Sequence, residues 1–105
     1  MRHIEQLMLQ AIAAKKSWQS GNTSVVYEPE ISEPTHVRAE CSRVYLHGNH
    51  ICTVYHRSPF KDRGPVPNRD TFAAWPTPTT ASRLRALGVR ASIKDFQACI
   101  DGEPV

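Results

Sequence analysis

The sequence of 105 residues predicts an α+β fold with an N-terminal helix, a small antiparallel sheet of three to four strands and two short C-terminal helices. Three observations predict this fold. Apolar residues recur at helical spacing near the N-terminus. A glycine–asparagine pair separates two β-prone runs in the middle of the chain. Hydroxyl-bearing cap residues and glycines bracket two short segments near the C-terminus.

The bulk composition is typical of one folded domain that spans residues 1–105. The chain is 40% hydrophobic and 22% charged, which predicts a modest core rather than disorder. Its formal net charge is +3, and the basic residues are spread along the chain. This charge permits an anionic ligand, but it lacks the dense basic stripe of a nucleic-acid coat. We expect no stable nucleic-acid partner.

The cysteines and the apolar stretches indicate the cellular compartment in which the protein is expected. Cys41, Cys52 and Cys99 are odd in number and form no CxxC pair, and no segment resembles a signal peptide. They predict a cytoplasmic protein with reduced thiols. The apolar stretch of residues 4–14 is too short and too interrupted to span a bilayer, so no membrane partner is expected.

The first helix is predicted over residues 3–17. Lys15 and Lys16 fall in its last turn, where cations suit the helix dipole, and Gly21 ends the segment. The stripe on one face predicts packing on a sheet. It consists of Ile4, Leu7, Met8, Ala11 and Ile12.

The strands are predicted from two β-prone segments. Residues 22–30 form the first strand, which Pro29 limits, and residues 30–37 form a loop. Residues 42–57 predict a hairpin with a two-residue turn at Gly48-Asn49. The predicted register pairs His47 with His50, Leu46 with Ile51, and Tyr45 with Cys52.

Both faces of this hairpin carry apolar residues. One face is expected to pack on the helix, and the other to meet a second subunit or a ligand. The first face consists of Val44, Leu46, Ile51 and Tyr55. The second consists of Tyr45, Cys52 and Val54.

The C-terminal half is predicted as a loop, a strand and two helices. Residues 58–70 are an irregular, exposed loop, and residues 71–75 (TFAAW) are a short final strand. Thr79 or Thr80 then caps a helix that Gly88 closes. That helix carries Leu84 and Leu87.

A last short helix is predicted from residues 92–95 (SIKD), which resemble a capping box with Asp in place of the usual Glu. Its apolar stripe is Ile93, Phe96 and Ile100, and Gly102 ends it.

A metal site is one interpretation of the hairpin. His47, His50 and Cys52 would lie close together, and imidazole and thiolate suit zinc. Cys41 or His36 would have to fold over as the fourth ligand. Histidines beside a tight turn are more often surface residues, so we expect no metal.

No pattern typical of an enzyme is present in the sequence. It contains no G-x-S-x-G, Walker loop or paired-carboxylate motif. Cys52 lies within a predicted strand, away from a helix N-terminus that would depress its pKa. We expect no catalytic residue and no cofactor.

The stretch TPTTASRLRAL predicts a site for an anionic, aromatic ligand. A helix N-terminus suits a phosphate, to which Thr79 and Thr80 add hydroxyl donors. Arg83 can fork onto two phosphate oxygens. Trp75 and Phe72 precede the helix and can stack on a base. The structural alternative is an N-cap, solvated arginines and a core tryptophan.

Three pieces of the sequence resemble small bacteriophage proteins: GNTSV at 21–25, YLHGNHI at 45–51 and AWPTPTTASRLRAL at 74–87. They are most similar to the first family of Thoeris anti-defence proteins. These proteins sequester the cyclic ADP-ribose isomers that Thoeris defence makes as an alarm. Some members hold cyclic di- or trinucleotides from related systems such as CBASS.

The resemblance implies a sponge in the host cytoplasm that binds its cyclic nucleotide without cleaving it. It also implies a homo-oligomer with pockets shared between protomers, either a dimer or a larger assembly such as a hexamer. Replacing Arg83 with alanine is expected to abolish uptake while leaving the fold intact. The predicted ligand-binding residues are Asn22, Phe72, Trp75, Thr77, Thr79, Thr80, Arg83 and Arg90.

Two other classes of function stay open. A small phage inhibitor that binds a host defence protein directly, in the manner of an anti-CRISPR factor, would act through the 58–70 loop and the basic surface. A small RNA or DNA binder would show an affinity for oligonucleotides that falls steeply with salt.

Overall fold

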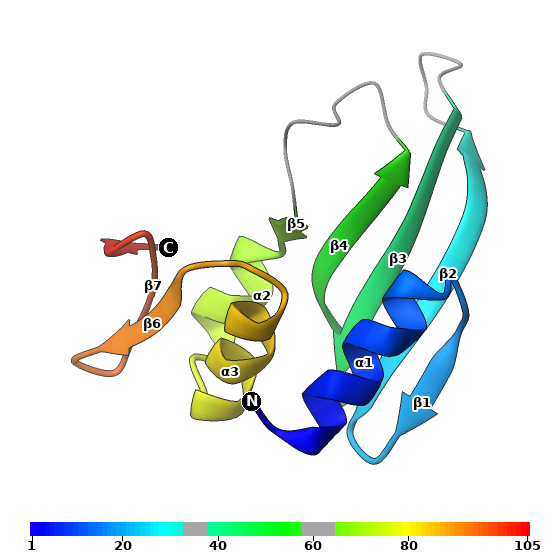
Figure 1. The fold of residues 1–105 in the computed structure, drawn as a ribbon. Helices are drawn as coiled ribbons and strands as arrows, with labels where there is room; N and C mark the ends of the chain where they lie inside the picture. The colour runs from blue at the N-terminus through cyan, green and yellow to red at the C-terminus, as the bar shows by residue number, and fades with distance from the viewer. Residues whose placement is uncertain (33–37, 58–64) are drawn as a thin grey trace.

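The computed structural model describes residues 1–32, 38–57 and 65–105, and it confirms the α+β class (Figure 1). A five-stranded antiparallel sheet has the order β1-β2-β3-β4-β5, and a three-stranded sheet has the order β6-β7-β8. The helices are α1 (His3–Ala13), α2 (Arg69–Ala74) and α3 (Pro78–Ala86). The strands are β1 (Trp18–Ser20), β2 (Thr23–Ser32), β3 (Arg38–Leu46), β4 (Asn49–Arg57), β5 (Pro65–Pro67), β6 (Ala91–Lys94), β7 (Gln97–Ile100) and β8 (Glu103–Pro104).

Helix α1 ends four residues before the predicted boundary. Lys15 adopts a left-handed conformation with φ of 55°. Its N–H donates to the carbonyl of Ile12, and the N–H of Lys16 donates to that of Ala11. This bonding pattern is a Schellman motif, which satisfies the last carbonyls and turns the chain out of the helix. The chain then forms β1, an edge strand that the sequence did not predict.

The β3–β4 turn lies one residue earlier than predicted. His47 and Gly48 occupy it with φ of 52° and 79°, as a type I′ turn requires, so the predicted Gly48-Asn49 turn and its register are wrong. A register shift next to the turn leaves the adjacent Ile51 and Cys52 both buried, although the sequence placed them on opposite faces. The observed pairs are Leu46–Asn49, Tyr45–His50 and Val44–Cys52.

The segment predicted as a final strand is helix α2. The side chain of Asn68 accepts a hydrogen bond from the N–H of Thr71 (3.1 Å) and caps the helix, which favours α over β locally. Part of the predicted 58–70 loop is the edge strand β5, where Pro65 and Pro67 are tolerated. Residues 33–37 and 58–64 of the two predicted loops lie outside the described residues.

The predicted last helix is a hairpin instead. Asp95 and Phe96, with φ of 52° and 63°, form a two-residue turn between β6 and β7. Asp101 and Gly102, with φ of 54° and 80°, form a second such turn before β8. Turns of this hand match the twist of paired strands. The resemblance of SIKD to a capping box was therefore misleading.

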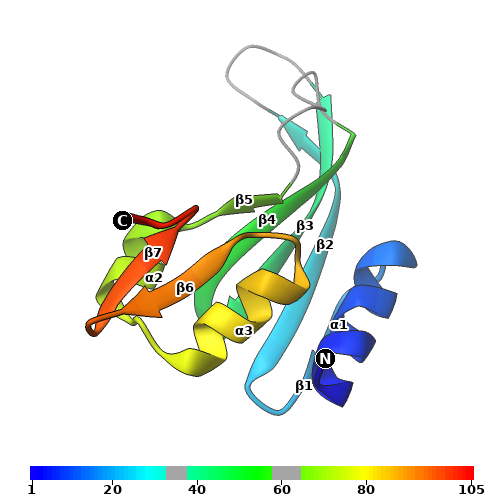
Figure 2. The same cartoon turned by 60° about the vertical axis from the view of Figure 1, so that its left-hand side comes forward.

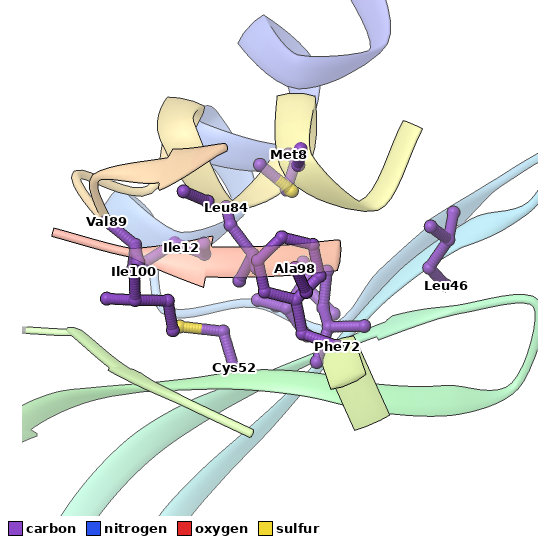
Figure 3. Close-up of a cluster of buried hydrophobic side chains, with 14 residues drawn as sticks. Met8, Ile12, Leu46, Cys52, Phe72, Leu84, Val89, Ala98 and Ile100 are labelled. Carbon is purple, nitrogen blue, oxygen red and sulfur yellow. The ribbon is translucent and has the colours of Figure 1, made fainter. Parts of the chain in front are cut away.

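Both long helices cover one face of the five-stranded sheet. Helix α1 contacts β2 and α3, and α3 contacts β4 and the second sheet (Figure 2). Figure 3 shows the core that this arrangement closes, with Phe72 of α2 beside Leu84 of α3 and Ala98 of β7. The core therefore joins both sheets and all three helices in one cluster.

Helix α3 begins with Thr77 as its N-cap rather than Thr79 or Thr80. The Thr77 hydroxyl accepts from the N–H of Thr80 (3.1 Å), and Pro78 occupies the first helical position, where no N–H is needed.

Replacing Thr77 with alanine is expected to lower the free energy of unfolding by roughly 0.5–2 kcal/mol, since it removes the cap. Urea unfolding would measure the change. Thr79→Ala is the matched control, because Thr79 is half-buried in the same turn and is not the cap. Equal losses in the two variants would contradict the assignment of the cap.

Candidate functional site

A pocket of about 280 Å³ lies between the β3–β4 turn and the connection from α2 to α3. We call it the turn–helix pocket. The β3–β4 hairpin contributes Leu46, His47, Asn49 and Ile51. The two helices and their connection contribute Thr71, Trp75, Thr77 and Thr80.

Two aromatic residues of α2 differ sharply in what they can reach. Phe72 is 0% exposed and belongs to the core, so it offers no ring face to a ligand. Trp75, at the end of the helix, is 60% exposed and lines the pocket. Both backbone polar groups of Trp75 are hydrogen-bonded. Its N–H donates to the carbonyl of Thr71, and its carbonyl accepts from the N–H of Thr77. Of the two predicted stacking residues, Trp75 alone is accessible.

The hydroxyls at the start of α3 face each other. The Oγ1 atoms of Thr77 and Thr80 are 2.9 Å apart, and Thr80 is buried while Thr77 is exposed. Thr80 therefore forms part of the pocket wall, and Thr77 is the hydroxyl of the pair that meets solvent. The positive end of the helix dipole lies at the same place and suits a negative group.

Arg83, predicted to hold phosphate, is instead the centre of a buried network. It is 3% exposed, and its Nη1 donates to Oε2 of Glu5 (2.9 Å), which is 2% exposed. Its Nε donates to Oγ1 of Thr23 (3.0 Å). A buried charge that loses its partner is costly, so the arginine is held inside the protein. Its replacement is expected to destabilise the fold, contrary to the expectation from the sequence.

The carboxylate of Glu5 stays ionised in this network. Burial raises its pKa, but hydrogen bonds from Ser82 (2.6 Å), from Arg83 and from the backbone N–H of Arg2 lower it, with a net shift below the ordinary value. The network thus links α1, the start of β2 and α3.

Asn22 extends this network to the pocket. Its side-chain oxygen accepts from the hydroxyl of Thr23 (2.9 Å), and its backbone carbonyl accepts from the N–H of His47 (2.8 Å). Asn22 therefore supports the turn that forms one wall. Thr79 does not line the pocket, and Arg90 lines a different recess beside β5.

His50 of the hairpin has structural contacts on both ring nitrogens. Asn68 Nδ2 donates a hydrogen bond to Nδ1 of His50 (3.1 Å), so Nδ1 is the ring nitrogen without a proton. The proton of the neutral His50 ring is therefore on Nε2, which faces Oγ1 of Thr53 (2.9 Å). Burial and the charge of Arg43 lower the pKa of His50, which favours this neutral form. The ring therefore joins β4 to the cap of α2.

No group of three or more His, Cys, Asp or Glu that could hold a metal occurs within the described ranges, and His36 lies outside them. All three cysteines are buried thiols. Burial raises the pKa of Cys52 to about 12, so this thiol stays protonated at neutral pH. Among residues 1–32, 38–57 and 65–105, no helix is long and apolar enough to cross a membrane.

Sequence reasoning found one side of the pocket and missed the other. Trp75, Thr77 and Thr80 converge there as predicted neighbours in sequence. The residues missed are Leu46, His47, Asn49, Ile51 and Thr71. Four of them lie in the string LHGNHI, which the sequence already singled out. Because the turn was predicted one residue too late, the sequence could not show which of these side chains face α2.

The model of a family described as Kyanoviridae Gp96 protein matches residues 1–105. No curated protein and no solved structure matches the chain.

Proposed function

From the premise that the chain belongs to the Kyanoviridae Gp96 protein family, and is therefore a phage protein, we propose that it sequesters a cyclic nucleotide immune signal without cleaving it. The proposed ligand is a cyclic ADP-ribose isomer or a cyclic di- or trinucleotide. The observation that carries the proposal is the exposed indole of Trp75, which borders the turn–helix pocket at the N-terminus of α3.

The lining of the pocket suits a nucleobase. Leu46 and Ile51 supply apolar surface, and the indole of Trp75 supplies a face for stacking. The Asn49 amide can donate to and accept from the edge of a base. Thr77 and the first turn of α3 lie where a phosphate attached to that base would gain from the helix dipole.

The size and charge of the pocket favour sharing the ligand between copies of the chain. A volume of about 280 Å³ is at the small end of ligand pockets, which suits a base and part of its sugar. None of the described lining residues is Lys or Arg. We propose that a homo-oligomer supplies the remaining contacts, including a cation for the phosphate.

The kind of groups in the lining supports binding without cleavage. The described lining residues contribute hydroxyls, an amide, an imidazole and an indole, and no carboxylate or thiolate. Such groups can hold a ligand by stacking and hydrogen bonds. The activation of a nucleophile by a carboxylate or thiolate is not available among them.

Calorimetric titration against cyclic ADP-ribose isomers, cyclic dinucleotides and cyclic trinucleotides tests the proposal. We expect Trp75→Ala to weaken binding by about 5- to 150-fold, the loss of one stacked base. Gln19→Ala, exposed on β1 and outside the pocket lining, is the control and should bind normally. Ligand released by heating should be chemically intact. No binding across the panel, or unchanged affinity in Trp75→Ala, would overturn the proposal.

A protein-binding inhibitor remains the alternative function. Residues 58–64 of the loop assigned to it lie outside the described residues, so this alternative stays a prediction from the sequence.

A further inference from the structure

The tip of the β6–β7 hairpin presents an aromatic ring to solvent. Phe96 is 96% exposed and has φ of 63°, a conformation that bulky residues rarely adopt. Type I′ turns favour glycine at this position, after an Asn or Asp such as Asp95. The ring is thus not needed for the turn, and its exposure gives it no role in the core. The positive φ of this bulky residue, at a turn that does not need it, makes Phe96 a candidate for a contact with another molecule.

A recess of about 430 Å³ lies at the other end of the same hairpin. We call it the base recess. Apolar surface comes from Pro65, Val66 and Pro67 of β5, which are half-buried, and the buried Val89 and Ile100 also line the recess. Two exposed arginines, Arg69 and Arg90, share the lining with the acidic Asp101. The base recess therefore combines an apolar part with a mainly cationic rim.

The tip cannot reach the base recess of its own chain. The tip closes at the Lys94–Gln97 pair, whereas the recess lies beside the Ala91–Ile100 pair. Three steps along a strand separate the two by roughly 10 Å. In Figures 1 and 2 the tip points away from β5. Any hairpin tip that fills the recess must therefore come from another molecule.

We propose that the occupant is the hairpin tip of a second copy of this chain. Phe96 of one copy enters the apolar part of the base recess. Its neighbour Asp95 then faces the guanidinium groups of Arg69 and Arg90, which are complementary in charge. Lys94, on the other side of the tip, faces Asp101.

The placement of tip and recess makes the contact reciprocal. Because they lie at opposite ends of one hairpin, two hairpins that run antiparallel fill both recesses at once. This is a two-fold symmetric dimer, the commonest oligomer. Two phenylalanines bury about 150–250 Å² each, a fraction of the roughly 1,200–2,000 Å² of a stable interface. We therefore expect a reversible dimer whose population rises with protein concentration.

Sedimentation equilibrium of the purified chain without ligand tests the contact. Wild type should dimerise, and Phe96→Gly should raise the dimer dissociation constant by about 30-fold or more, as for an interface hot spot. Glycine suits the turn, so the same variant should keep or gain thermal stability. Trp75→Ala, an exposed aromatic elsewhere, is the control and should dimerise normally. A monomeric wild type, or unchanged dimerisation of Phe96→Gly, would overturn the proposal.

A charge exchange tests the orientation. Asp95→Arg places like charges together and should weaken the dimer, and adding Arg90→Asp should restore much of the loss. Additive weakening in the double variant would overturn the assigned pairing. No nucleotide is present in these experiments. Their failure would overturn this hairpin contact alone, because the proposed uptake of nucleotide calls for an oligomer but not for this particular one. Failed nucleotide binding would leave the dimer standing.

Discussion

Replacing Arg83 with alanine is expected to lower the free energy of unfolding by about 3–5 kcal/mol, the cost of breaking a buried ion pair. The variant leaves the carboxylate of Glu5 buried without its cation and removes the donor to Thr23. All described buried side-chain nitrogen and oxygen atoms have a partner, so no spare group is evident to replace it. The total free energy of unfolding of a domain of this size is roughly 5–15 kcal/mol, so the loss is severe.

Urea unfolding of a variant set would separate charge from packing. Glu5→Gln should also destabilise, because it strands the guanidinium of Arg83. The double variant Glu5→Leu, Arg83→Met should recover most of the loss, since apolar residues of similar size replace buried ion pairs well. If Arg83→Ala remained within about 1 kcal/mol of wild type, a value typical of exposed pairs, the network would not have the assigned role.

The same network should appear in the acid unfolding of the wild type. The folded pKa of Glu5 lies below its ordinary value of 4.5, so the unfolded chain takes up this proton at a higher pH than the folded protein. The stability that Glu5 contributes is therefore fully present above its ordinary pKa of 4.5. It is lost as the pH falls through the lower folded pKa. The double variant lacks this part of the acid sensitivity.

Phe72→Ala is expected to cost about 3–5 kcal/mol, the range for a large aromatic removed from a core. The ring is 0% exposed and lies in the core beside Leu84 of α3 and Ala98 of β7 (Figure 3). Thermal unfolding followed by circular dichroism would report the change.

Trp75→Ala is the matched control for this variant, because both aromatics belong to the same short helix and its cap. Its indole is mostly exposed, so its loss should change stability by no more than about 0.5 kcal/mol. Comparable losses in the two variants would mean that Trp75 packs as a core residue, and the turn–helix pocket would lose its stacking surface.

Local patterns predicted those parts of the fold whose signals lie within a few residues. The apolar stripe of α1 and the threonine-rich start of α3 were predictable because spacing and capping are local. The last hairpin was not, since its Asp95-Phe96 turn lacks the glycine that marks such turns. The β3–β4 register failed for a similar reason, because His47 adopts a positive φ that sequence rules assign to glycine or asparagine.

In the candidate site, too, the sequence predicted local features and missed those that depend on distant contacts. Trp75, Thr77 and Thr80 are neighbours in sequence, and they line the same pocket in the structure. Arg83 was assigned to a ligand because its partner, Glu5, lies 78 residues away in the chain. Local sequence cannot distinguish an arginine exposed on a helix from one buried in a core, because the difference depends on that distant contact.

The ion pair between Glu5 and Arg83 also sets an order of events during synthesis. The ribosome makes the N-terminus first, and Glu5 has no counter-charge from this pair until the next 78 residues, the last of them Arg83, have been added. At about 5–20 residues per second, that interval lasts roughly 4–16 seconds. Helix α1 can therefore pack on β2 before α3 is made, whereas the buried carboxylate of Glu5 gains this cation only when α3 docks.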